Sequence, residues 1–120
     1  YVADEIRAAE SQCDAYEDIL GTYLIKVSSS KLSQAESEEA TMLLKVIGDY
    51  ERISDHAVNI LESAEELRDK KLSLSEEALK EYKTLAKAID EILTLSETAF
   101  VRADTQMAAN VEPLEQVIDD

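Results

Sequence analysis

The stretch IGDYERISDHAVNILE, residues 47–62, decides the fold of this chain. At about 100° per residue, Glu51 and Asp55 lie one turn apart on one edge of a helix. The adjoining stripe is mostly apolar and comprises Ile47, Tyr50, Ser54, Val58 and Leu61. Carboxylates beside such a stripe are held near a core, and a hard cation needs several oxygen ligands that converge at one point. The stretch therefore predicts an amphipathic helix with a candidate metal-binding edge.

The composition favours an all-α fold. Among 120 residues there are only two Gly and one Pro, too few turn residues for a β protein. Trp is absent and aromatic residues make up 5%, so the core must be built from aliphatic side chains. Such a core suits an antiparallel bundle of long helices, and the apolar spacing predicts four of them.

The second helix is the longest by prediction. Apolar residues at three- and four-residue spacing indicate a helix over about residues 2–27, with an apolar stripe that comprises Ile6, Ala9, Cys13, Tyr16, Leu20, Tyr23 and Val27. Ser33 and Glu36 form a capping-box pattern, which predicts the start of a second helix that runs to about Asp69.

N-cap residues predict where the third and fourth helices start. Ser73 with Glu76 repeats the capping-box pattern and predicts the start of the third helix. Asp104 is expected to cap a fourth, which runs to the end of the sequence with a kink at Pro113 because proline removes a backbone donor. The chain begins and ends without helix caps, so we expect it to be part of a longer protein.

Charge limits the partners. A net charge of -15 argues against direct binding to nucleic acid or to an anionic lipid surface, since both repel an acidic protein. The single Cys13 cannot form an internal disulfide and is interpreted as a small core residue in a reducing compartment. No apolar run approaches the roughly 20 residues that a membrane span needs.

One spacing recurs along the chain. Three Glu-x-x-x-Asp pairs sit beside apolar or small residues, namely Glu10/Asp14, Glu51/Asp55 and Glu115/Asp119. A fourth pair, Glu65/Asp69, has Arg68 next to it and is expected on a solvated surface. Because one or two such pairs are expected by chance at helical spacing, two interpretations stay open: metal ligation, or an acidic helix edge in water.

Catalysis has little support. A di-iron carboxylate oxidase needs Glu-x-x-His on two helices, whereas the only histidine, His56, has Ile53 three residues before it. No histidine is placed beside Cys13 and no Gly-rich phosphate loop exists, so we expect no enzyme activity. His56 and Arg52 are expected on the outer side of their helix, with Arg52 paired to acidic neighbours.

The segment DYERISDHAVNI, residues 49–60, resembles the signature of PhoU domains, helical modules of phosphate regulation whose motif runs roughly (D/N)-x-E-R-I-x-D-x-A-x-N-I. Ser54 stands where that family usually has glycine. The flanking segments are most similar to the cytoplasmic PhoU domain that follows the membrane region in bacterial sodium/phosphate cotransporters. The resemblance implies a non-catalytic cytoplasmic regulator whose partner is the membrane transporter domain of the same parent chain. A free-standing PhoU-type regulator and a purely structural interaction bundle are the alternatives.

The resemblance also implies a transition metal, with iron first and Mn, Zn, Ni or Mg as alternatives. The expected ligands are Glu51, Asp55, Glu10 and Asp14, joined by Glu115 and Asp119 from the recurring spacing, with Asp49 and Asn59 as supporting residues. A metal-free chain is also compatible with this resemblance, because the second half lacks its own ERISD-like helix.

PhoU domains generally contain two three-helix repeats. By that resemblance, residues 1–70 and 73–120 would each supply two of three helices, all within one PhoU-like domain. Apolar stripes would then lack their cover, for example Leu85, Ile89, Ile92, Leu93 and Phe100. We therefore expect a homo-oligomer, most simply a dimer, unless the third helix folds back onto the first two.

Overall fold

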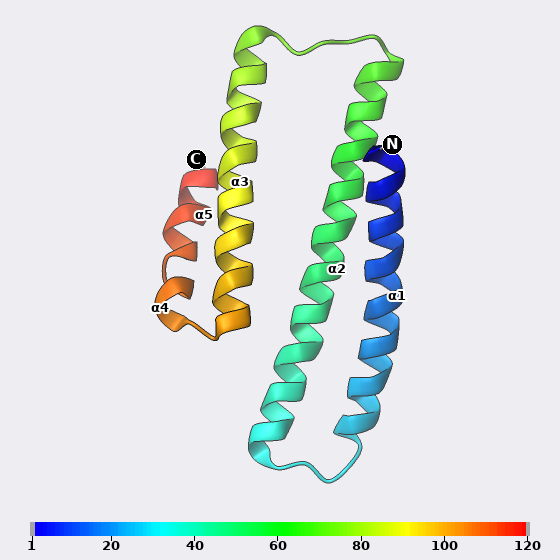
Figure 1. Ribbon diagram of the computed structural model, residues 1–120, viewed down its shortest axis with the longest axis vertical. Helices are drawn as coiled ribbons and strands as arrows, with labels where there is room; N and C mark the ends of the chain where they lie inside the picture. Colours follow the sequence, from blue (N-terminus) through cyan, green and yellow to red (C-terminus); the bar gives the residue numbers. More distant parts are fainter. Residues whose placement is uncertain (1, 120) are drawn as a thin grey trace. The chain divides into compact units, whose positions relative to one another are not determined.

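The computed structural model describes residues 2–119 and confirms the all-α fold (Figure 1). The helices are α1 (Val2–Ser28), α2 (Gln34–Asp69), α3 (Glu76–Arg102), α4 (Thr105–Ala108) and α5 (Val111–Asp119). They form two compact units, Tyr1–Leu72 and Ser73–Asp120, which are described separately below. Within residues 2–119, no helix combines the length and the apolar character that crossing a membrane requires.

In the first unit, α1 and α2 run antiparallel and side by side (Figure 1). The side of α1 that faces α2 carries half-buried or buried residues at three- and four-residue spacing, namely Ala3, Ile6, Glu10, Cys13, Glu17, Gly21, Leu24 and Val27. Leu24 from α1 and Ala40 from α2 are the most deeply buried apolar residues of this pair.

The apolar stripe expected on the first helix was wrong at its aromatic positions. Tyr16 is 61% exposed and Tyr23 is 63% exposed, while Leu24, which was not on that stripe, is buried. On α2, Tyr50 is likewise exposed. The tyrosines lie on a row beside the inward row of each helix, because the pairing of α1 with α2 buries a different face from the one on which the sequence pattern placed them.

The capping box at the start of α2 is confirmed. The backbone N–H of Glu36 donates to Ser33 Oγ at 3.2 Å, and the backbone N–H of Ser33 donates to Glu36 Oε2 at 2.8 Å. These hydrogen bonds from Ser33 lower the pKa of the Glu36 carboxyl. Two otherwise unsatisfied donors of the first turn are thereby paired.

The start of α3 differs from the prediction. Ser75 is the N-cap, since its hydroxyl accepts from the backbone N–H of Ala78 at 3.1 Å, and Ser73 lies outside the helix. With Ser75 as the cap, Glu76 and Glu77 both fall in the first turn. Carboxylates there interact favourably with the positive end of the helix dipole, which favours this register over the capping box of Ser73.

In the second unit the expected fourth helix is present in two pieces. Asp104 caps the first piece, α4, by accepting from the backbone N–H of Met107 at 2.9 Å. The chain leaves the helix at Ala109 and Asn110 and restarts as α5, which packs against α3 (Figure 1). The break precedes Pro113 because in a continuous helix the proline ring would clash with the carbonyl of Ala109. In the first turn of α5 its missing N–H costs nothing.

One ion pair joins the two long helices of the first unit. The guanidinium of Arg7 on α1 donates to both carboxylate oxygens of Glu65 on α2, at 3.0 and 2.6 Å. The expectation that Glu65 lies on a solvated surface was wrong, because its side chain is only 24% exposed. Asp69, the other residue of this Glu-x-x-x-Asp spacing, is 70% exposed. The hydrogen bond from Arg7 lowers the pKa of Glu65.

The buried position of Leu24 makes it a test of the α1/α2 packing. Leu24→Ala should lower the free energy of unfolding by about 2 to 4 kcal/mol, since it leaves a cavity among atoms that relax only partly. Its neighbour Ile25 is 64% exposed, so Ile25→Ala should change it by less than about 0.5 kcal/mol. Urea unfolding followed by circular dichroism measures both. Equal losses for the two variants would contradict this packing.

Arg7 and Glu65 predict how stability depends on pH. A carboxyl whose pKa is lowered in the folded chain stabilises it fully above its unfolded value, near 4.5, and this contribution is lost as the pH falls through the folded pKa. Glu65→Gln should therefore have a lower urea midpoint of unfolding than the wild type at pH 7, and the difference between the two midpoints, called the gap here, should disappear at acid pH. The matched control is Glu66→Gln, because Glu66 is exposed and pairs only with Lys70. A gap that is equally wide at both pH values would contradict the prediction.

Candidate metal centre

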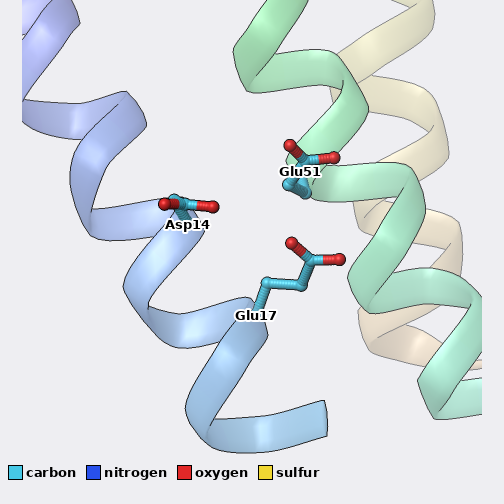
Figure 2. A group of neighbouring side chains, drawn as sticks. All are labelled: Asp14, Glu17 and Glu51. Carbon is cyan, nitrogen blue, oxygen red and sulfur yellow. The ribbon is translucent and has the colours of Figure 1, made fainter.

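Three carboxylates meet where α1 faces α2 (Figure 2). Asp14 and Glu17 come from α1 and Glu51 comes from α2. One carboxylate oxygen from each residue lies within 4.8 Å of the other two. Figure 2 shows Glu17 extending from α1 toward Glu51 on the facing helix. Hereafter these three residues are called the carboxylate cluster.

The helix pairing explains why this cluster forms. Glu17 follows Cys13 by four residues on the inward row of α1, and Glu51 follows Ile47 by four residues on α2. Residues at this spacing share one helix face, so both carboxylates are carried inward and both are half-buried. Asp14 lies at the exposed edge of the same contact.

The cluster concentrates negative charge. A side-chain hydrogen bond with Asp55 raises the pKa of Glu51, and partial desolvation and the charges of Asp55, Glu17 and Asp14 raise it further. Within residues 2–119 the ion pairs join Arg7 to Glu65, Arg52 to Asp49, Arg68 to Asp69 and Lys70 to Glu66. None of these basic side chains pairs with the cluster. Its charges are therefore left without a cationic partner from the described chain.

The donor set fits a hard or borderline divalent cation. Such an ion takes oxygen ligands at about 2.0 to 2.6 Å, so two oxygens bound to it lie within roughly 5 Å of each other. The spacing within the cluster meets that requirement with small side-chain adjustments. Three carboxylates would fill half of an octahedral shell, and Asp55, one turn from Glu51, could add a fourth oxygen.

Only some of the sequence-predicted ligands of the first unit lie together in the structure. Asp14, Glu51 and Asp55 come together. Glu10 is half-buried on the inward row of α1 but is not part of the cluster. Glu115 and Asp119 are exposed on α5, in the other unit, and their role as ligands stays a prediction.

The predicted supporting residues point to the solvent side of α2. Asp49 lies 4.0 Å from the guanidinium of Arg52, which confirms that Arg52 pairs with an acidic neighbour. Asn59 is exposed, and its backbone carbonyl accepts from the hydroxyl of Ser63 at 3.0 Å. His56 is exposed as expected.

The sequence analysis missed Glu17. The search followed Glu-x-x-x-Asp pairs, and Glu17 stands three residues after Asp14, outside any such pair. The sequence does show that Glu17 shares one helix face with Ile6, Glu10 and Cys13, at steps of three and four residues. It does not show that this is the face of α1 that meets α2.

Comparison with known protein families decides the classification. The family model of the PhoU domain matches residues 2–64, which is more than half of the chain. The chain belongs to the PhoU domain family. The matched segment contains α1 and most of α2, and with them the carboxylate cluster and Asp55. Searches of curated proteins and of solved structures found no match.

Membership in this family suggests a role in the regulation of phosphate transport. PhoU domains are regulatory modules and not an enzyme family. The second unit lies outside the matched residues, so its assignment to a second PhoU repeat stays a prediction.

Charge repulsion within the cluster predicts that the metal-free protein gains stability when one carboxylate is removed. At pH 7 in a chelator, Glu51→Gln should raise the Tm, because a neutral amide replaces a charge held beside Asp55, Glu17 and Asp14. The matched control is Glu62→Gln, which changes an exposed glutamate of the same helix. Differential scanning calorimetry measures both, and a lower Tm for Glu51→Gln would contradict the prediction.

Proposed function

We propose that this PhoU domain is a non-catalytic regulator of phosphate transport whose carboxylate cluster binds a divalent metal ion. The observation that carries the proposal is the cluster itself: α1 and α2 each contribute to it, it lies inside the segment that matches the family, and no basic side chain of the described chain pairs with it. The donor set suits Fe²⁺, Mn²⁺ and Mg²⁺, and Zn²⁺ or Ni²⁺ less well because it consists of oxygens alone.

Metal binding would couple the two helices. Without a cation, like charges from α1 and α2 oppose their contact at the cluster, whereas a bound cation attracts both sides. A ligand that binds only the folded arrangement stabilises it by RT ln(1 + [L]/Kd), about 2.7 kcal/mol at a hundredfold excess over Kd. Bound metal would thus raise the fraction of molecules in which α1 and α2 are packed together at the cluster. A transporter in contact with this pair would respond to that change.

We further propose that the domain lies on the cytoplasmic side of a sodium/phosphate cotransporter and acts on the membrane domain of the same parent chain. The support is the similarity of the segments that flank the signature. Because no helix within residues 2–119 suits a membrane, the spans would come from other parts of the parent protein. The coding sequence upstream of Tyr1 separates the candidates: several apolar segments of about 20 residues would favour the cotransporter, and their absence would favour a free-standing regulator.

Titration with metal tests the proposed site. Isothermal titration calorimetry of chelator-treated protein with Mn²⁺ should give one site, and Glu17→Gln should weaken binding at least tenfold, since it removes a charged ligand. The control is Asp18→Asn, which removes the same charge from the adjacent exposed position on α1. Binding that is equal in the two variants would contradict the site.

A purely structural bundle is the alternative function. It predicts no saturable metal binding in that titration. It also predicts that phosphate uptake by cells that express the full parent protein is unchanged by Glu17→Gln. The metal-dependent regulator predicts that uptake changes with Glu17→Gln and not with Asp18→Asn.

A further inference from the structure

Helix α2 ends at a left-handed residue that is not glycine. Lys71 has a φ of 54°, and its backbone N–H donates to the carbonyl of Arg68 at 3.0 Å. The backbone N–H of Leu72 donates to the carbonyl of Leu67 at 2.9 Å, which completes a Schellman motif. Glycine usually occupies the left-handed position of this motif, because a Cβ there crowds the following carbonyl. The end of α2 is therefore strained at one residue.

Local contacts hold this helix end in place. Every residue from 68 to 77 is exposed, so tertiary packing does not fix the segment 70–75 that joins α2 to α3 (Figure 1). Besides the Schellman hydrogen bonds, the ion pair of Lys70 with Glu66 and the Ser75 cap of α3 support the break. The segment contains neither Gly nor Pro, the two residues that oppose a helix most strongly. Its sequence is thus compatible with a helix as well as with a break.

The end of α3 has the same backbone geometry in different surroundings. Ala103 has a φ of 49°, and the backbone N–H of Asp104 donates to the carbonyl of Ala99 at 2.9 Å. Ala99 is buried, Asp104 is half-buried, and α4 and α5 both pack against α3. A right-handed Ala103 would carry α4 and α5 away from α3 and expose their apolar contacts. Packing therefore fixes the turn after α3, whereas the end of α2 relies on local bonds.

The apolar spacing of α2 continues in phase across the break. The row of α2 that faces α1 advances by alternating steps of four and three residues, through Ala40, Leu44, Ile47, Glu51, Ser54, Val58, Leu61 and Glu65. The same steps, continued through the segment 70–75, reach a mostly apolar row of α3. Its members are Leu79, Tyr82, Ala86, Ile89, Leu93, Ser96 and Phe100. A helix through this segment would therefore carry one row from α2 into α3.

We propose that residues 70–75 form a convertible break, in which Lys71 moves from the left-handed to the right-handed region and α2 and α3 become one helix. Conversion relieves the strain at Lys71 and keeps the row in phase, but it loses the Schellman hydrogen bonds and the Ser75 cap. Because all of these contributions are local, the two forms lie close in free energy, and a partner that binds one form better shifts the equilibrium. The carboxylate cluster takes no part, so this switch does not depend on the proposed metal.

Nuclear magnetic resonance at residues 70–75 tests the switch. In a ¹³C,¹⁵N-labelled sample of the full chain, saturation transfer at the ¹³Cα nuclei should reveal a minor form with helical shifts from Lys71 to Ser75. Lys71→Gly should lower the population of this form about fivefold, because glycine accepts the left-handed region and is a poor helix former. Ser75→Ala should raise it about fivefold, since it removes the cap that favours the break.

The matched control is Ala103→Gly, which places glycine at the equivalent left-handed position after α3. It should leave the minor form at residues 70–75 unchanged. The proposal is overturned if neither the wild type nor Ser75→Ala shows a minor form, or if the minor form lacks helical shifts. Equal populations in Lys71→Gly and Ser75→Ala would also overturn it, because the exchange would then not involve the left-handed end of α2.

Discussion

Negative charge on the packed side of α1 and α2 constrains how these two helices can pair. The inward rows of a helix pair are normally apolar, yet here they include Glu10, Glu17, Glu51 and Glu65. Removing a carboxylate from water without a partner is costly, so each such group needs a counter-charge or continued access to solvent. Glu65 has the guanidinium of Arg7. The carboxylate cluster has no such partner among residues 2–119, and a cation from solution would serve as one.

That contrast gives the two ends of the helix pair different roles. At the Arg7 end, the contact between α1 and α2 is complete with the residues of the chain itself. At the cluster, a hydrogen bond with Asp55 and the charges of neighbouring carboxylates raise the pKa of Glu51, and no basic side chain of residues 2–119 pairs with it. Under the proposed function, the Arg7 end would keep the helices together while the cluster would respond to a metal ion.

The helices of this chain were largely predictable from the sequence. The face by which each helix packs against its neighbour was not. The capping box of Ser33 and Glu36 set the start of α2, because those hydrogen bonds involve residues three positions apart. Tyr16 was assigned to the wrong face of α1, and Glu17 was missed as a member of the carboxylate cluster. The location of both depends on which of two rows on α1 meets α2. That choice is made by the pairing of two helices and not by the periodicity of one. The helix likewise breaks before Pro113 and not at it, because the proline ring would clash with the carbonyl of the residue four positions earlier.

We expect one cation to bind across α1 and α2, and paramagnetic broadening by Mn²⁺ detects such binding. In a ¹⁵N-labelled sample of the full chain, substoichiometric Mn²⁺ should first broaden amide signals near Asp14 and Glu17 and, at the same metal ratio, those near Glu51 and Asp55. Broadening on two segments far apart in sequence at once requires an ion held between the helices. Broadening that begins instead at Glu115 and Asp119 on α5, or that spreads evenly over all acidic segments, would contradict the claim.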